Sequence, residues 1–217
     1  KNQIAKNKMS IKYSNLVRIG DVVLMRYNYK SKDNSETNEG ILYPEKVISK
    51  QIFCIPMNKI EELGGGKNIF KRSLFRIENP QSCIFQYQYE NAKKILKDKK
   101  NDKLLTKEEE SVKELCLLAN EEKKGNESEF QLNYNNEVAY GQMIQFRNVF
   151  TNELLVVDMA NISKEIGCLD VVLNPLGGQT AWFKLIPSHK IRNQGECISY
   201  LDDFYILPTG LETESFM

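Results

Sequence analysis

The stretch from residue 115 to residue 157, LCLLANEEKKGNESEFQLNYNNEVAYGQMIQFRNVFTNELLVV, is the part of the chain that decides the fold. It opens with apolar residues at helical spacing and ends in short runs typical of strands. The stretch therefore predicts a helix that leads directly into a β-sheet. Because it contains no obvious catalytic group, we interpret the helix as part of a binding module and not of an enzyme.

The helical character extends upstream of this stretch. Residues 91–126 are rich in Lys, Glu, Leu and Ala, which favour helices. Asn101 and Asp102 indicate a turn, Thr106 and Glu109 form a capping box, and Gly125 suits the left-handed end of a helix. The sequence thus predicts a helix–turn–helix pair over about residues 91–126. Its second helix carries one apolar stripe, which consists of Val112, Leu115, Cys116 and Ala119.

The remainder of the chain is predicted to be β-sheet. Short runs rich in β-branched or aromatic residues, bounded by turn residues, predict strands. Many short strands at this spacing favour a sandwich or a closed barrel. The predicted strands lie at residues 22–25, 52–55, 73–77, 83–87, 143–146, 154–157, 182–185 and 204–207.

A faint internal repeat narrows the choice of fold. The segments GDVVLMRY, GQMIQFRN and GECISYLD begin at Gly20, Gly141 and Gly195. A glycine at such a position permits a tight turn where strand pairing begins. Three related units predict a β-trefoil barrel, and the helix–turn–helix pair falls inside the first unit as an inserted arm. We therefore expect residues 1–217 to form one β-trefoil domain.

Charge and composition exclude several functional classes. The formal net charge is only +1, so no strong field favours nucleic acid or an anionic membrane as a partner. No apolar run approaches the ~20 residues that span a bilayer. The chain begins at Lys1 without a methionine, which suggests a fragment whose parent can hold further segments. The cysteine count is odd and lacks CxxC spacing, so we expect reduced thiols in a cytosolic setting at Cys54, Cys83, Cys116, Cys168 and Cys197.

Few residues are candidates for chemistry. The one histidine, His189, has no Asp, Glu or Cys at metal-ligand spacing, so we expect no metal, cofactor or catalytic site. The GGGKN sequence at residues 64–68 lacks the spacing of a phosphate-binding loop. A cysteine-dependent enzyme that uses Cys197 and His189 remains an alternative without support from spacing.

Four segments together resemble a known family. They are IGDVVLMRY (19–27), EEKKGNESEF (121–130), YGQMIQFRNVFTNELLVV (140–157) and QTAWFKLIPSHKIRNQGE (179–196). They are similar to the I-G-D strand, the E-K-K-x-N-E-T-E stretch, the Y-G-x-x-I-Q-L strand with its following hairpin, and the S-W-F segment of the amino-terminal suppressor domain of inositol trisphosphate receptors. Order and spacing match over roughly residues 16–207. Ryanodine receptors have a related first domain, and the resemblance does not separate the two.

The resemblance implies a β-trefoil with a projecting helical arm. It also implies a non-catalytic domain of an intracellular calcium-release channel, on the cytoplasmic face of the endoplasmic reticulum or a related store. Such a domain lowers ligand affinity and couples binding to gating through contacts with neighbouring domains and subunits, in a parent expected to be a tetramer. Inositol trisphosphate is expected to bind downstream domains, and no direct contact with membrane or nucleic acid is implied.

The resemblance also implies two contact surfaces. One is the stripe of the arm helix. The other is the loop after the strand of Trp182, where the family's P-F-Y-K-L-R stretch carries an aromatic contact residue. Here that loop contains Pro187, Ser188, His189, Lys190 and Arg192, with serine and histidine in place of the family's Phe and Tyr.

The sequence departs from the family pattern in a second way, at its C-terminal end. The family domain continues beyond the strand at 204–207, whereas this chain ends at Met217, so the third unit has too few residues to complete its hairpins. Unpaired edge strands would result.

The alternative function is a β-trefoil scaffolding or carbohydrate-binding module in a large cytosolic or cytoskeletal assembly.

Overall fold

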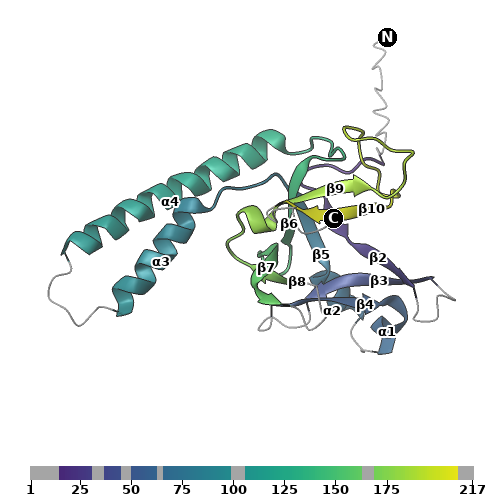
Figure 1. The fold of residues 1–217 in the computed structure, drawn as a ribbon, viewed down its shortest axis with the longest axis horizontal. Coiled ribbons are helices and arrows are strands. Elements are labelled where there is room, and N and C mark those ends of the chain that lie inside the picture. Colours follow the sequence, from purple (N-terminus) through teal and green to yellow (C-terminus); the bar gives the residue numbers. More distant parts are fainter. Residues whose placement is uncertain are drawn as a thin grey trace, which may run out of the picture.

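A computed structural model describes residues 15–30, 37–44, 50–62, 66–98, 106–162 and 169–209. It consists of a β-rich body from which a pair of helices projects (Figure 1). The predicted turn at Asn101 and Asp102, the thiol of Cys168 and both chain ends lie outside the described residues.

The main sheet contains seven strands. Its path runs β1 (Val22–Leu24), β5 (Leu74–Glu78), β6 (Met143–Asn148), β7 (Leu154–Ile162) and β8 (Leu169–Asn174), while β9 (Phe183–Pro187) joins β6 to β10 (Phe204–Pro208). The strand pairings are all antiparallel. The strands predicted near residues 22, 73, 143, 182 and 204 are thus confirmed to within about two residues, and the strand predicted at 154–157 is confirmed but continues five residues further, to Ile162.

A second, three-stranded sheet lies beside the first. It is formed by β2 (Arg26–Lys30), β3 (Thr37–Pro44) and the predicted β4 (Ile52–Pro56), and the short helices α1 (Met57–Glu62) and α2 (Gly66–Arg72) pack against it. A small core of Ile41, Ile60 and Ile69 joins these elements. The polar pattern of β2 and β3 gave no strand signal in the sequence.

Three separate segments meet in a closed ring of backbone hydrogen bonds. The N–H of Val17 donates to the carbonyl of Ile198 at 2.8 Å, Ile198 donates to Val138 at 2.8 Å, and Val138 donates to Val17 at 2.9 Å. All three side chains are buried in the main core. The ring therefore joins three parts of the chain that lie far apart in the sequence.

A tight turn follows each member of the ring, at residues 18–21, 139–142 and 199–202. In each turn the first carbonyl accepts from the fourth N–H, and the fourth side chain, from Asp21, Gln142 or Asp202, accepts from the first N–H. The third position is Gly20 with φ 96° and Gly141 with φ 83°, as the repeat predicts. In the third unit, however, that position is Leu201 and not Gly195, so the sequence alignment of that unit was wrong.

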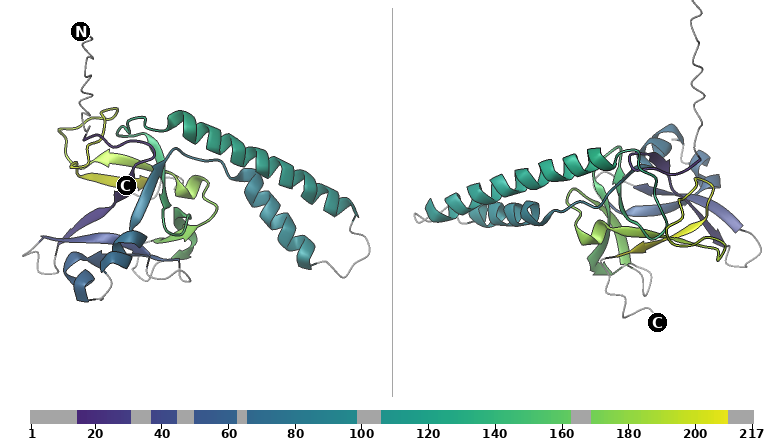
Figure 2. Two further views of the ribbon diagram at one scale, coloured as in Figure 1. Left: turned by 180° about the vertical axis from the view of Figure 1, so that it is seen from behind. Right: turned by 90° about the horizontal axis from the view of Figure 1, so that it is seen from above.

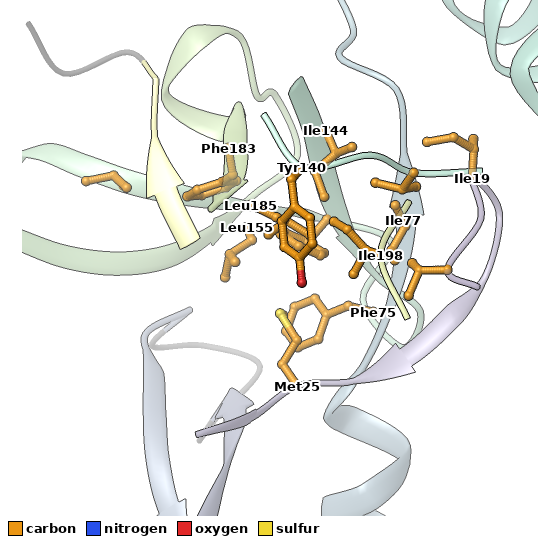
Figure 3. Close-up of a cluster of buried hydrophobic side chains, with 14 of the residues drawn as sticks. Ile19, Met25, Phe75, Ile77, Tyr140, Ile144, Leu155, Phe183, Leu185 and Ile198 are labelled. Atoms are coloured by element: carbon orange, nitrogen blue, oxygen red, sulfur yellow. The ribbon is translucent and has the colours of Figure 1, made fainter. Parts of the chain in front are cut away.

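Two of the turns contribute side chains to the main hydrophobic core, Ile19 from the first and Tyr140 from the second. Figure 3 shows Tyr140 among the apolar side chains that line it, including Met25, Phe75 and Ile198. Burial, with a smaller contribution from the nearby Asp202 carboxylate, raises the pKa of Tyr140 to about 12. The phenol is therefore neutral at physiological pH, as a core position requires.

The arm consists of α3 (Ile84–Asp98) packed along α4 (Thr106–Asn133), and it extends away from the body (Figures 1 and 2). The predicted helical pair is confirmed, but two details were wrong. The strand expected at residues 83–87 is the first turn of α3. Gly125 does not end the second helix, which continues to Asn133 and is followed by Asn135 with a left-handed φ of 69°.

The body is thus all-β with a helical insertion. In the part of the chain that the structure describes, β1 pairs only with β5 and β10 only with β9, so the sheet does not close into a barrel.

Candidate protein interaction site

A carboxylate clasp at the start of α3 joins the two helices of the arm where the chain enters it. Glu122 of α4 accepts hydrogen bonds from the Ser82 hydroxyl at 2.7 Å and from the N–H groups of Ile84 at 2.8 Å, Phe85 at 3.4 Å and Gln86 at 3.1 Å. These N–H groups have no partners within their own helix, and the positive end of the helix dipole favours an anion there. Glu122 therefore caps α3 from the neighbouring helix.

Asn126 lies one turn further along α4 and completes the clasp. Its side-chain oxygen accepts from the Ser82 N–H at 3.1 Å, and its amide donates to the Ser82 carbonyl at 2.7 Å. Asn126 thus pairs with the backbone of Ser82 as a neighbouring strand would. Together, Glu122 and Asn126 fix the angle at which the chain enters the arm.

The electrostatics of the clasp favour ionised Glu122. Partial burial alone would raise the pKa of its carboxyl, but the Ser82 hydroxyl and the donors of Gln86 and Phe85 outweigh this and hold the pKa below its usual value. The clasp is therefore fully formed at neutral pH.

A buried polar network holds residues 79–83, the linker between β5 and α3, against the body. Glu78, at the end of β5, receives the Arg147 Nε of β6 at 2.9 Å and the Gln145 amide at 3.1 Å. Gln81 of the linker donates its N–H to Gln145 at 3.1 Å and accepts from Arg147 at 3.0 Å. Because Glu78 and Gln145 are almost fully buried, these contacts fix the linker firmly.

The predicted apolar stripe of α4 lies at least partly in the interface between α3 and α4. Ala119 is buried, and Val112, Leu115 and Cys116 are half-buried. Cys116 interacts with Tyr89 of α3, and Glu122 on the same side of α4 caps that helix. The stripe therefore packs mainly against α3. Only its partly exposed residues could also contact another protein.

The loop after β9 is held at its two ends. Ser188 donates its hydroxyl to the carbonyl of Asp203 at 2.9 Å, and Arg192 pairs with Asp202 at 3.1 Å. The hydrogen bond to Asp202 is the main reason that the pKa of Arg192 is raised. Asp202 also closes the third tight turn, so this loop is tied to the end of the body that carries the three turns.

The middle of this loop points to solvent. The side chains of His189 and Lys190 are exposed and have no hydrogen-bond or ion-pair partner among the described residues, while the His189 carbonyl accepts from the Arg192 N–H at 3.3 Å. Between Lys190 and Arg192 lies Ile191, whose exposed fraction is 86%. Sequence reasoning did not include Ile191 in the site, because a lone isoleucine in a charged loop gives no signal until its exposure is known.

The cysteine-nucleophile alternative is disfavoured by the geometry. The Cys197 thiol donates to the Glu137 carboxylate at 3.3 Å, and this hydrogen bond, with a smaller effect of burial, raises the pKa of the thiol. No hydrogen bond joins Cys197 to His189, although the structure describes both residues. A thiol with a raised pKa yields little thiolate at neutral pH, and the thiolate is the reactive species.

Other site classes find no geometric support within the described ranges. There, no group of three or more His, Cys, Asp and Glu side chains is placed to hold a metal ion. None of the described helices has both the length and the apolarity to cross a membrane.

Comparison with known proteins assigns the family. The family model described as inositol 1,4,5-trisphosphate/ryanodine receptor matches residues 13–214. Over 107 residues, 49% of this chain, the sequence is 28% identical to the inositol 1,4,5-trisphosphate receptor itr-1 of Caenorhabditis elegans, and this region covers 4% of that protein. The clasp residues Glu122 and Asn126 lie in the EEKKGNESEF segment that carries the resemblance. The chain belongs to the inositol 1,4,5-trisphosphate/ryanodine receptor family.

Proposed function

We propose that the chain is a regulatory, non-catalytic domain of the suppressor type, which lowers ligand affinity elsewhere in a larger intracellular calcium-release channel. The observation that carries this proposal is the family match over residues 13–214. The relative itr-1 is named as an inositol 1,4,5-trisphosphate receptor. In this proposal the ligand binds downstream domains, and the whole protein assembles as a tetramer with this domain on the cytoplasmic side of the store membrane.

The fold in this proposal is a β-trefoil. Its support is the ring formed by Val17, Val138 and Ile198 and the three matching turns that follow it. One side of the body, between β1 and β10, would need a further strand from outside the described residues to close the barrel.

Two surfaces would carry the regulation. The clasp at Glu122 and the buried network at Glu78 hold the arm at a set angle, so the arm can transmit force as a lever. The loop that presents His189, Lys190 and Ile191 is tied to the body by Arg192. Contacts that favour one assembly state change ligand affinity at a distant site by their coupling free energy, typically about 1–3 kcal/mol.

Substitution of Ile191 in the whole receptor tests this division of roles. Ile191→Ser removes an exposed apolar contact and leaves the fold intact, so the thermal unfolding of this domain should be unchanged. The proposal expects inositol trisphosphate to bind several-fold more tightly to the variant receptor, because suppression is weakened. Leu117→Ser, which changes an exposed residue on the arm, separates the contribution of the loop from that of the arm. Unchanged affinity in both variants would exclude these two surfaces.

A further inference from the structure

A polar cavity of about 870 Å³ lies where the arm meets the body. This volume is within the range of small-molecule sites. Residues of α3, α4, β5, β6 and the segment after β8 line the cavity, so both the arm and the body contribute to it. The family contacts proposed above make no use of this cavity.

Most of the carboxylates near the cavity are already engaged. Glu78 receives Arg147, Gln145 and Gln81, and the adjacent Glu122 receives the donors at the start of α3. Glu90 lies 3.9 Å from Lys93. The charge of Glu78 is thus compensated by Arg147, whereas the donors on Glu122 are neutral and leave its negative charge beside the cavity.

The cations that line the cavity are mostly unengaged. Three of these cations have side chains without a hydrogen-bond or ion-pair partner among the described residues: Arg76 of β5, Lys94 of α3 and Lys123 of α4. Among the carboxylates of the lining, the side chain of Glu127 likewise has no such partner in the described part of the chain. Over the whole lining, the four cations Arg76, Lys94, Lys123 and Arg147 face the three carboxylates Glu78, Glu90 and Glu127, so the formal excess is one positive charge.

Arg76 is the most unusual of these cations. It is half-buried and lies directly opposite Arg147 across the β5–β6 pair, so two like charges face each other. Such a pair is destabilising unless each charge is compensated. Arg147 has Glu78 as its partner, whereas Arg76 has none, so an anion at Arg76 would relieve the repulsion.

We propose that this cavity binds a small organic phosphate monoester. Its phosphate carries about −1.5 to −2 charges at neutral pH, which the unpaired cations Arg76, Lys94 and Lys123 can compensate. Arg76 supplies a planar donor pair for the phosphate, and Lys94 and Lys123 approach it from the two arm helices. Phe130 and Leu176, also in the lining, offer apolar surface to the organic body of the ligand.

Such a ligand would contact the arm and the body at once. Binding would therefore stabilise the arm in the orientation set by the clasp. This inference goes beyond the proposed suppressor function and does not depend on it, because a phosphate site at the arm root can exist in a domain of any regulatory role.

Isothermal titration of the 217-residue chain with phenyl phosphate tests the proposal, with phenol as the neutral control. We expect phenyl phosphate to bind with a dissociation constant below about 1 mM and phenol not to bind. Arg76→Gln should weaken binding about tenfold or more, and Lys123→Gln, at an exposed position, should weaken it several-fold. Arg26→Gln is the matched control, because Arg26 pairs with Glu39 away from the cavity and its loss should leave binding unchanged.

Three results would overturn the proposal. They are no binding of phenyl phosphate to the wild-type chain, equal binding of phenol, or equal affinity in the Lys123→Gln and Arg26→Gln variants. Because Lys123 is exposed, that variant should fold even if Arg76→Gln does not. A negative outcome here would leave the ligand-affinity test of the proposed function unaffected.

Discussion

The Glu122 carboxylate accepts a hydrogen bond from the Ser82 hydroxyl at 2.7 Å across 40 positions of sequence. The contact joins the middle of α4 to the residue at which the chain enters α3. The arm is therefore stabilised at its root as well as along the packed faces of its two helices.

Removal of the Glu122 side chain should destabilise the arm. Glu122→Ala leaves the first N–H groups of α3 without their carboxylate, which we expect to cost about 1–2 kcal/mol of unfolding free energy. Glu121→Ala, at the exposed neighbouring position, is the control and should change stability by less than about 0.5 kcal/mol. Urea titration followed by circular dichroism measures both. Equal stability of the two variants would show that the clasp contributes nothing.

The contribution of Glu122 should depend on pH in a defined direction. The pKa of Glu122 is lowered in the folded chain, so its contribution to stability is present above the ordinary carboxyl value and is lost as the pH falls through the folded value. The difference in unfolding free energy between wild type and Glu122→Gln should be full at about pH 7 and should shrink below about pH 4. A difference that grows on acidification would contradict the assigned charge state.

Two glycines should respond in opposite ways to alanine. Gly20 has a φ of 96°, and a Cβ there would lie 2.3 Å from the ring of Tyr134, so Gly20→Ala should cost about 2 kcal/mol or more. Gly125 lies inside α4 with open space around it, so Gly125→Ala should stabilise the helix by up to about 1 kcal/mol. Thermal unfolding of the two variants checks the pair. A stabilised Gly20→Ala chain would refute the turn geometry.

The Cys197 thiol should react slowly with an alkylating agent at neutral pH. Its hydrogen bond to Glu137 raises its pKa, so little thiolate is present. Glu137→Gln removes the negative charge and should accelerate labelling, while Glu127→Gln, which is away from the thiol, should not. Peptide mass analysis after timed labelling gives the rates. Fast labelling of wild-type Cys197 would revive the cysteine-nucleophile alternative.

The sequence predicted the body and the arm for identifiable physical reasons. Strands with β-branched and aromatic runs, such as β6 and β9, carry their signal locally, and so does the long Lys- and Glu-rich helix. The prediction of a strand at the start of α3 was wrong because Phe85 and Tyr87 show the alternation of a strand. The group that caps this segment as a helix is Glu122, which belongs to another helix and lies far away in the sequence. Gly125 was wrongly assigned as a helix end because tertiary packing carries α4 past it.

The candidate site was less accessible to sequence reasoning. The loop at residues 187–192 followed from resemblance, but the exposure of Ile191 depends on how Arg192 and Asp202 hold the loop. The unpaired Arg76 is visible only once the register places it opposite Arg147. Both features arise from long-range contacts, which local patterns do not encode.

Calorimetric titration with inositol trisphosphate tests the central claim most directly. It compares the 217-residue chain alone, the downstream ligand-binding domains alone, and the two joined as in the parent receptor. We predict that the chain alone binds inositol trisphosphate no more tightly than the roughly millimolar affinity expected of a phosphate monoester at the arm-root cavity, and that the joined protein binds about 5- to 150-fold more weakly than the downstream domains alone. Tight binding by the isolated chain, or equal affinity of the joined and separate downstream domains, would contradict the claim that this domain acts by suppression.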